Sequence, residues 1–168
     1  VITTGGTIEK IYDEETGILL NRHSQLQVML KRLRLPYTDI IQQELLCKDS
    51  LEMTDKDRET ILQAVQRHLP KNLPIVILHG TDTMAVTAQH LFDHLSALKV
   101  PIILTGAMRP FGFENSDALQ NFTEALMAAW LLKPGVYIAM HNKVHPLPHV
   151  RKNRGKGTFE KFEHSESS

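Results

Sequence analysis

Three uninterrupted apolar runs, each followed by small polar residues, constrain the fold of this chain more than any other feature. They are residues 75–78, 102–104 and 136–140. Residues 1–2 resemble the end of a fourth run, and residues 39–46 are a weaker candidate. Apolar runs without polar alternation are typical of strands that are buried on both faces, as in parallel sheets.

The segments between these runs have apolar residues at helical spacing. This spacing predicts helices at about residues 24–33, 54–69, 83–98 and 116–132. Strands that alternate with helices favour right-handed βαβ units. We therefore predict an α/β fold: a three-layer, open, mostly parallel sheet with helices on both faces, Rossmann-like or flavodoxin-like.

The length of 168 residues favours a single domain, which we place at residues 1–150. Pro146 and Pro148 are expected to end regular structure after the last strand. The composition changes to Lys, Arg, Gly, Glu and Ser from Arg151 onward, without an apolar stripe. We expect residues 151–168 to be a solvated, polar carboxyl-terminal extension.

Charge and cysteine content restrict the function classes. Nineteen basic and nineteen acidic residues give a formal net charge of zero, so neither nucleic acid nor an acidic membrane surface is an expected partner. No apolar segment approaches the roughly 20 residues that span a bilayer. Cys47 is the single cysteine, which excludes an internal disulfide and fits a reducing compartment. We predict a cytoplasmic protein with a small-molecule partner.

Neither a metal nor a cofactor is expected. His141, His145 and His149 are spaced by four residues, but the prolines between them prevent a helix from aligning the three rings. The full G-x-G-x-x-G spacing of a dinucleotide site is absent, and so is a P-loop.

The residues that follow the strands are the candidates for chemistry, because ligands of open α/β sheets bind at the carboxyl ends of the strands. Gly5 and Gly6 follow the run at residues 1–2 and allow backbone N–H groups to approach a ligand, although a structural turn is an equally good interpretation. Thr81 and Asp82 follow the run at residues 75–78. They favour function, with helix capping as the alternative, which Thr83 shares.

Three blocks in this order closely resemble the amino-terminal domain of bacterial-type L-asparaginases. They are residues 4–8 (TGGTI), 79–84 (HGTDTM) and 105–110 (TGAMRP), and residues 49–54 (DSLEMT) resemble the family's substrate-binding segment. The resemblance covers nearly the whole chain. It implies a short-chain form without the family's smaller carboxyl-terminal domain, and a homodimer or a higher homo-oligomer.

The resemblance also implies roles for individual residues in hydrolysis of the asparagine side-chain amide, with glutamine as a possible second substrate. Thr7 resembles the nucleophile, and Thr81 and Asp82 resemble two members of a second Thr-Lys-Asp set. Tyr12 is the candidate for the tyrosine of the mobile loop. Amino-acid substrate would contact Ser50 and Asp82, and the backbone or small side chains at Gly6, Gly80 and Ala107.

The lysine of the second set is less well defined. The resemblance places it at Val100, and Lys99 is the nearest lysine, so Lys99 is the expected member. Because adjacent strand residues point to opposite faces, Lys99 would need a bulge or a frayed strand start to reach Asp82. The alternatives are a catalytically weak amino-acid-binding or regulatory domain, and an ammonia-generating amidotransferase subunit.

Overall fold

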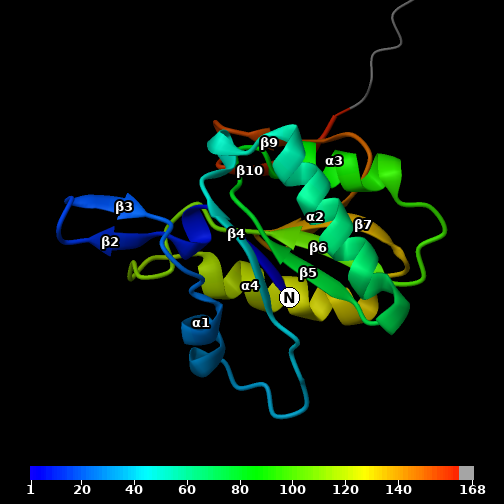
Figure 1. The fold of residues 1–168 in the computed structure, drawn as a ribbon, viewed down its shortest axis with the longest axis horizontal. Helices are drawn as coiled ribbons and strands as arrows, with labels where there is room; N and C mark the ends of the chain where they lie inside the picture. Colours follow the sequence, from blue (N-terminus) through cyan, green and yellow to red (C-terminus); the bar gives the residue numbers. More distant parts are fainter. Residues whose placement is uncertain (163–168) are drawn as a thin grey trace, which may run out of the picture.

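A mixed six-stranded sheet forms the centre of the molecule in a computed structural model that describes residues 1–162 (Figure 1). Its strand order is β4-β1-β5-β6-β7-β8. The strands are β1 (Ile2–Gly5), β4 (Gln43–Lys48), β5 (Ile75–Leu78), β6 (Pro101–Thr105), β7 (Gly135–Met140) and β8 (Lys143–Pro146). The first five strands are parallel, and β8 is antiparallel to β7. The predicted α/β class and mostly parallel sheet are confirmed.

All four predicted helices are present, each slightly shorter than expected. They are α1 (Leu26–Arg32), α2 (Asp55–His68), α3 (Met84–His94) and α4 (Ala118–Leu131), with short 3₁₀ turns η1 (Thr7–Glu9), η2 (Ser50–Glu52) and η3 (Leu69–Lys71). α2 begins with a capping box, in which Thr54 accepts from the Asp57 amide and Asp57 accepts from the Thr54 amide. This exchange satisfies two backbone donors that a helix start leaves without partners.

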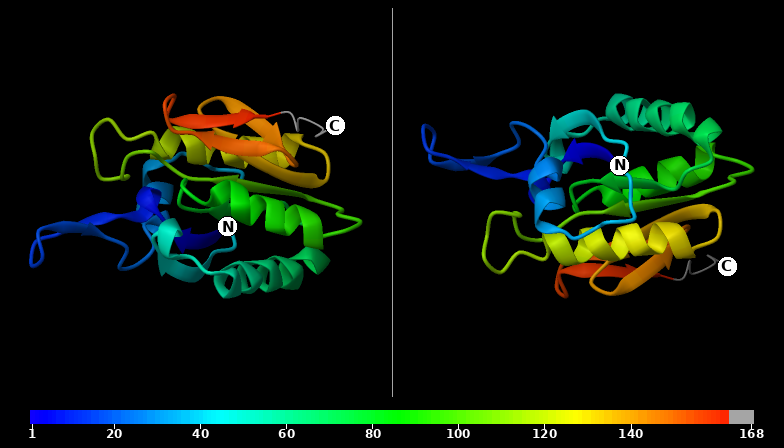
Figure 2. Two further views of the ribbon diagram at one scale, coloured as in Figure 1. Left: turned by 90° about the horizontal axis from the view of Figure 1, so that it is seen from above. Right: turned by 90° about the horizontal axis from the view of Figure 1, so that it is seen from below.

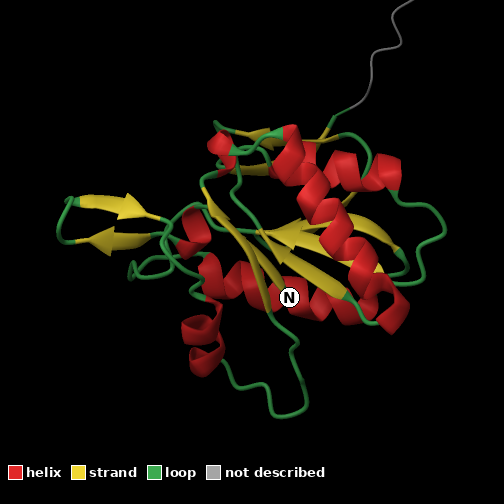
Figure 3. Cartoon of the chain, viewed as in Figure 1, coloured by secondary structure: helices red, strands yellow, loops and turns green. Residues whose placement is uncertain are grey.

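The helices cover both faces of the sheet. Helices α2 and α3 lie on one face and α4 lies on the other, as the three views agree (Figures 1 and 2), and Figure 3 shows the strands between the two helical layers. Along β5, Ile77 joins the core beneath α2 and α3, whereas Val76 and Leu78 join the core beneath α4. Because successive side chains enter opposite cores, the run has no polar position.

Two hairpins lie outside the six-stranded sheet. The first, β2 (Ile11–Asp13) with β3 (Ile18–Leu20), projects from the body of the molecule at the left of Figure 1. The second pairs β9 (Val150–Asn153) with β10 (Thr158–Lys161). This second hairpin packs against α3, β7 and β8.

The second hairpin differs from the expected solvated extension. Val150 and Phe159 are 6% and 2% exposed and belong to the core beneath α2 and α3, so the predicted boundary at residue 150 falls inside strand β9. The rest of the predicted extension, residues 163–168, lies outside the described residues. Regular structure also continues past Pro146 and Pro148, in strands β9 and β10. Pro146 itself is the last residue of strand β8. Proline is tolerated there because β8 is an edge strand.

Within residues 1–162, no helix combines the length and the apolar character that crossing a bilayer requires.

Candidate active site

Three close backbone approaches bring the strand ends together at the carboxyl edge of the sheet. A Cβ atom built at Gly6 would lie 2.3 Å from the Cα atom of Gly80, and one built at Gly80 would lie 2.6 Å from the Oγ atom of Ser50. A Cβ atom at Gly106 would lie 2.3 Å from the carbonyl oxygen of His79. Only glycine permits these approaches, and Gly6 also has φ +81°. The glycines therefore place the residues that follow Gly6 and Gly80, Thr7 and Thr81, at the same edge.

The densest polar contact at this edge joins a threonine, an aspartate and a lysine. The Nζ atom of Lys152 donates to the Oγ1 atom of Thr81 at 2.8 Å and to the Oδ1 atom of Asp82 at 3.1 Å. Thr81 is 3% exposed, and its hydroxyl also donates to the Sδ atom of Met108 at 3.7 Å. The side chains of Lys152 and Asp82 are 15% and 23% exposed. This ion pair is thus partly withdrawn from water. Charge-assisted hydrogen bonds are stronger in such an environment than in bulk water.

The β9–β10 hairpin delivers Lys152 to Thr81. Alternation along β9 points Val150 and Lys152 toward the body of the molecule, and leaves Arg151 exposed. Sequence reasoning missed this lysine because it assigned the segment to a solvated tail. A signal was available: the runs VRKN and TFEK flank a four-residue turn that contains two glycines, a pattern typical of a hairpin.

Lys99, the expected lysine, lies at the amino edge of the sheet, where the parallel strands begin. It is exposed and stands two residues before Pro101, the first residue of β6. The Thr81–Asp82 pair lies at the carboxyl edge, beyond the end of β5. The length of a whole strand therefore separates Lys99 from the contact that Lys152 makes, and a bulge would not close this gap.

Ser50 and Thr83 connect the edge to the segment before α2. Ser50 is 1% exposed and begins η2, directly beside Gly80. The hydroxyl of Thr83 donates to the carbonyl oxygen of Ser50 at 2.8 Å. Thr83 is the N-cap residue of α3 but makes no side-chain capping bond. Capping therefore does not account for its hydroxyl, which fixes the Ser50 segment instead.

Thr7 and Tyr12 lie on the segment that leads into the projecting hairpin. Thr7 begins η1 and is partly exposed. Tyr12 lies on β2 and is 63% exposed, with its hydroxyl beside Gly17 of the same hairpin. Tyr12 is thus on a surface hairpin and is not packed against the Thr81–Asp82–Lys152 cluster in this arrangement.

A buried glutamate joins the two ends of this hairpin segment. Glu9 accepts hydrogen bonds from the backbone amides of Gly5 (2.9 Å) and Gln25 (3.2 Å), and from the hydroxyl of Ser24. Burial raises the pKa of Glu9 to about 7, against the lowering effect of these hydrogen bonds. The residue holds the start and the end of the segment that contains Thr7 and Tyr12.

His79 closes the carboxyl end of β5 beneath the site. Its Nε2 atom lies 2.9 Å from the hydroxyl of Thr87 on α3, and its Nδ1 atom lies 2.7 Å from the carbonyl oxygen of Gly80. The ring is fully buried, and this burial lowers its pKa to about 4. His79 is therefore neutral near pH 7 and supports the Gly80 turn from below.

Ala107 packs into the core with its side chain. It is 0% exposed and joins the cluster beneath α4, so only its backbone can face a ligand. The same loop is anchored by Asp117, which accepts from the amides of Met108 and Arg109, each at 3.0 Å.

Asp117 also links this loop to the hairpin that carries Lys152. Its Oδ2 atom lies 2.7 Å from the Nε2 atom of His141, and the Nδ1 atom of that ring lies 2.9 Å from the hydroxyl of Thr158 on β10. Asn121 donates to the same carboxylate oxygen at 2.8 Å. One carboxylate therefore organises two segments that border Thr81.

We expect the Asp117→Ala substitution to lower the free energy of unfolding by about 2 kcal/mol, because it leaves the partly buried Met108 amide and the His141 ring without their acceptor. Urea denaturation measures the loss. Asp93→Ala on the exposed side of α3 is the matched control and is expected to have a small effect. Equal midpoints for both variants would contradict this anchoring role.

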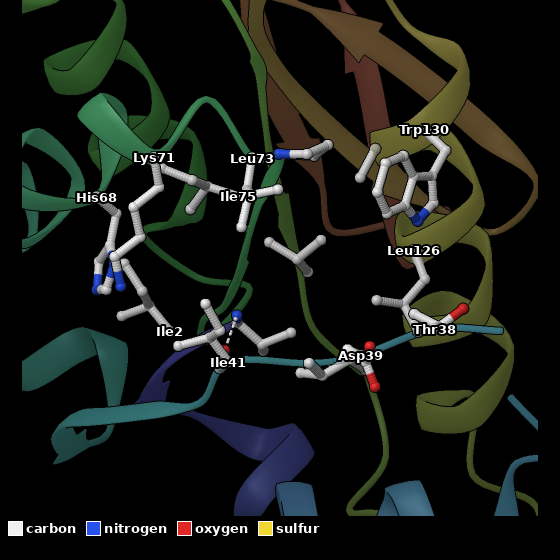
Figure 4. A pocket seen from close by; sticks show the side chains of 15 residues that line it. Ile2, Thr38, Asp39, Ile41, His68, Lys71, Leu73, Ile75, Leu126 and Trp130 are labelled. Atoms are coloured by element: carbon white, nitrogen blue, oxygen red, sulfur yellow. Dashed lines mark hydrogen bonds between the residues drawn. The ribbon is translucent and has the colours of Figure 1, made fainter. Parts of the chain in front are cut away.

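A hollow at the amino edge of the sheet is separate from this site. It encloses about 120 Å³ and is bordered by the starts of β1 and β5 and by the end of α4. In Figure 4, His68 and Lys71 lie on one side of it and Trp130 on the other. Because the Thr81–Asp82 pair lies at the carboxyl edge, this hollow contributes no group to the candidate site.

Among residues 1–162, no group of three or more His, Cys, Asp or Glu side chains is arranged to hold a metal ion. His141, one of the three histidines spaced by four, is instead bonded to Asp117 and Thr158. The chemistry that the cluster offers is that of a hydroxyl, a carboxylate and an amine in contact.

Comparisons with known proteins identify related sequences. The family model described as "Asparaginase, N-terminal" matches residues 1–166. An L-asparaginase of Thermococcus kodakarensis is 35% identical over 145 residues, which are 86% of this chain and 44% of that protein. One component of the glutamyl-tRNA(Gln) amidotransferase of Methanococcus vannielii is 32% identical over 148 residues, 86% of this chain and 34% of that protein.

The fold comparison gives the same result. The solved structure of the thermostable L-asparaginase from Thermococcus kodakarensis superposes with a TM-score of 0.83 and 32% identity, and the match covers 95% of this chain and 49% of that one. The chain spans about half or less of the length of these relatives. The sequence blocks, the sheet and the family match lead to one conclusion: this chain belongs to the asparaginase family and corresponds to its amino-terminal domain.

Proposed function

We propose that this chain is an amidohydrolase that converts the side-chain amide of L-asparagine to the carboxylate of L-aspartate, with release of ammonia. The observation that carries the proposal is the double contact of Lys152, whose Nζ atom lies within hydrogen-bond distance of both Thr81 and Asp82. A hydroxyl activated by a neighbouring base is the unit that covalent amide hydrolysis requires.

The proposed reaction has two steps. The Oγ1 atom of Thr7 attacks the amide carbon and gives up its proton, the C–N bond breaks, and ammonia leaves with an added proton. Water then attacks the ester on Thr7, which releases aspartate and restores the hydroxyl. Each step passes through a tetrahedral oxyanion. The backbone amides near Gly6 and Thr81 are the proposed donors to that oxyanion.

The Thr81–Asp82–Lys152 cluster would supply the proton transfers. Lys152, after losing its own proton to solvent, would take a proton through the Thr81 hydroxyl, and Asp82 would hold the lysine in position. Ser50 and Asp82 would hold the α-carboxylate and the α-ammonium group of the substrate. Tyr12 would join the site by movement of the hairpin that Glu9 fixes at its base, since its present position is on the surface.

Steady release of ammonia from L-asparagine by the isolated chain tests the proposal. Thr7→Ala, prepared in the same way, excludes a contaminating hydrolase, and L-glutamine measures the second substrate. Discrimination between the two amides is expected to be modest, because one methylene is worth about 1–3 kcal/mol. Saturable binding of aspartate without any turnover would instead favour an amino-acid-binding domain.

A second candidate function is ammonia supply to a transamidation partner, which the similarity to a glutamyl-tRNA(Gln) amidotransferase component favours. A protein of this kind is expected to release ammonia only with its partner present. Turnover by the isolated chain therefore separates the two candidates. A homodimer or a higher homo-oligomer stays a prediction, which sedimentation of the isolated chain tests.

A further inference from the structure

Asp82 contacts a second cation besides Lys152. An Nη atom of Arg154 lies 2.8 Å from the Oδ1 atom of Asp82, the same oxygen that Lys152 contacts at 3.1 Å. The two cations approach differently: the side chain of Lys152 is 15% exposed, whereas that of Arg154 is 71% exposed. Arg154 follows the last residue of β9 and reaches Asp82 from the solvent side.

Asp82 and the nearby Asp49 together pair with more cations than their own number. Lys10 pairs with Asp49 at 2.5 Å, so these two carboxylates are joined to three cations, Lys10, Lys152 and Arg154. The groups interact: although burial acts in the opposite direction, hydrogen bonds from Lys10 and Leu51 and the charges of Lys10 and Lys152 hold the pKa of Asp49 below its usual value. These ion pairs therefore carry one excess positive charge, which disfavours a cationic ligand group.

This excess matters for the substrate's ammonium group. A ligand ammonium that binds Asp82 must share the carboxylate with Arg154 or displace it. Exposed ion pairs contribute little free energy. We therefore expect Arg154 to weaken the binding of a ligand ammonium group a few-fold rather than by orders of magnitude. A guanidinium that Asp82 releases can in turn bind a carboxylate of the ligand through its planar N–H groups.

We propose that Arg154 is a specificity-determining residue that competes with the substrate's α-ammonium group for Asp82. Arg154 thereby reduces the preference of the site for L-asparagine over succinamate, the same amide without the ammonium group. The inference rests on the proposed function for the placement of the ligand. Arg154 does not take part in the bond-breaking steps, because it lies on the solvent side of the carboxylate.

Titration calorimetry with L-aspartate and succinate tests the inference, since these ligands differ only in the ammonium group. In the Arg154→Gln variant we expect the ratio of the aspartate association constant to that of succinate to rise about three- to fivefold. Arg151→Gln is the matched control: it removes the same charge from the same hairpin, but from a side chain that is paired with Glu160. It is expected to leave the ratio unchanged.

An unchanged or lower ratio in Arg154→Gln would overturn the inference, and so would failure of the wild-type chain to bind either ligand. Ammonia release from L-asparagine and from succinamate, measured in parallel, separates this result from the proposed function. A shifted ratio without turnover would leave the inference standing and overturn the hydrolase. Turnover with an unchanged ratio would support the hydrolase and overturn the inference about Arg154. Arg154 lies in an exposed turn, so the variant is expected to fold, and thermal denaturation confirms this.

Discussion

Replacing Lys152 with methionine is expected to reduce kcat for ammonia release from L-asparagine by about 10³-fold, the range that a positioned general base contributes. The reason is geometric: Lys152 is the group that contacts both the Thr81 hydroxyl and the Asp82 carboxylate. Methionine keeps the apolar stem of the side chain, so the packing of the β9–β10 hairpin is preserved. Steady-state assay of ammonia measures the loss.

Two further variants make the Lys152 result specific. Lys152→Arg retains a cation beside Asp82 but cannot accept a proton near neutral pH, so it is expected to be as slow as the methionine variant. Lys156→Met removes a lysine from the exposed turn of the same hairpin and is expected to keep its activity. Full activity in Lys152→Arg would show that only the positive charge is required. A loss in Lys99→Met of the same size would return the role to Lys99.

The Glu9→Gln substitution is expected to change how the stability of the protein depends on pH. The pKa of Glu9 is raised from 4.5 to about 7. Between these values the folded state keeps a proton that the unfolded chain releases, so stability falls as pH rises through this window, by about 3 kcal/mol in all. His79 has the opposite effect. Its pKa is lowered from 6.5 to about 4, so its contribution is lost as pH falls through that window.

The two contributions overlap between about pH 4.5 and 6.5 and oppose each other in the wild-type chain. Removing the Glu9 titration leaves that of His79, so the stability of Glu9→Gln relative to wild type is expected to rise by about 3 kcal/mol from pH 4.5 to 7.5. Urea denaturation at several pH values measures the difference. Glu14→Gln, on the exposed end of the first hairpin, is the control. A difference that does not vary with pH would show that Glu9 is ionised throughout.

The sheet was predictable because its signal is local. Residues 75–78 face two cores at once, and a run of four apolar residues is the direct result. The position of Thr81 was also predictable, because a polar turn after such a strand is placed at the ligand-binding edge in any open α/β sheet.

The placement of Lys152 beside Thr81 was not predictable in the same way, although its hairpin has a sequence signal. Its position depends on packing of Phe159 and Val150 into a core formed by helices far earlier in the chain, and a four-residue polar strand carries little local signal of its own. The error with Lys99 has a related cause: sequence spacing from a motif does not report which edge of the sheet a residue occupies. Glu9 was missed because its burial results from contacts with Ser24 and Gln25 across the hairpin segment.

The separation of 71 residues between Thr81 and Lys152 has a consequence for biosynthesis. Chains emerge from the ribosome with their amino-terminal parts first, so strands β1 and β4–β7 emerge before the β9–β10 hairpin does. A nascent chain at that stage holds the threonines and Asp82 without their amine. Hydrolytic competence, in the function proposed here, would then be acquired in a single event, when the β9–β10 hairpin docks on α3.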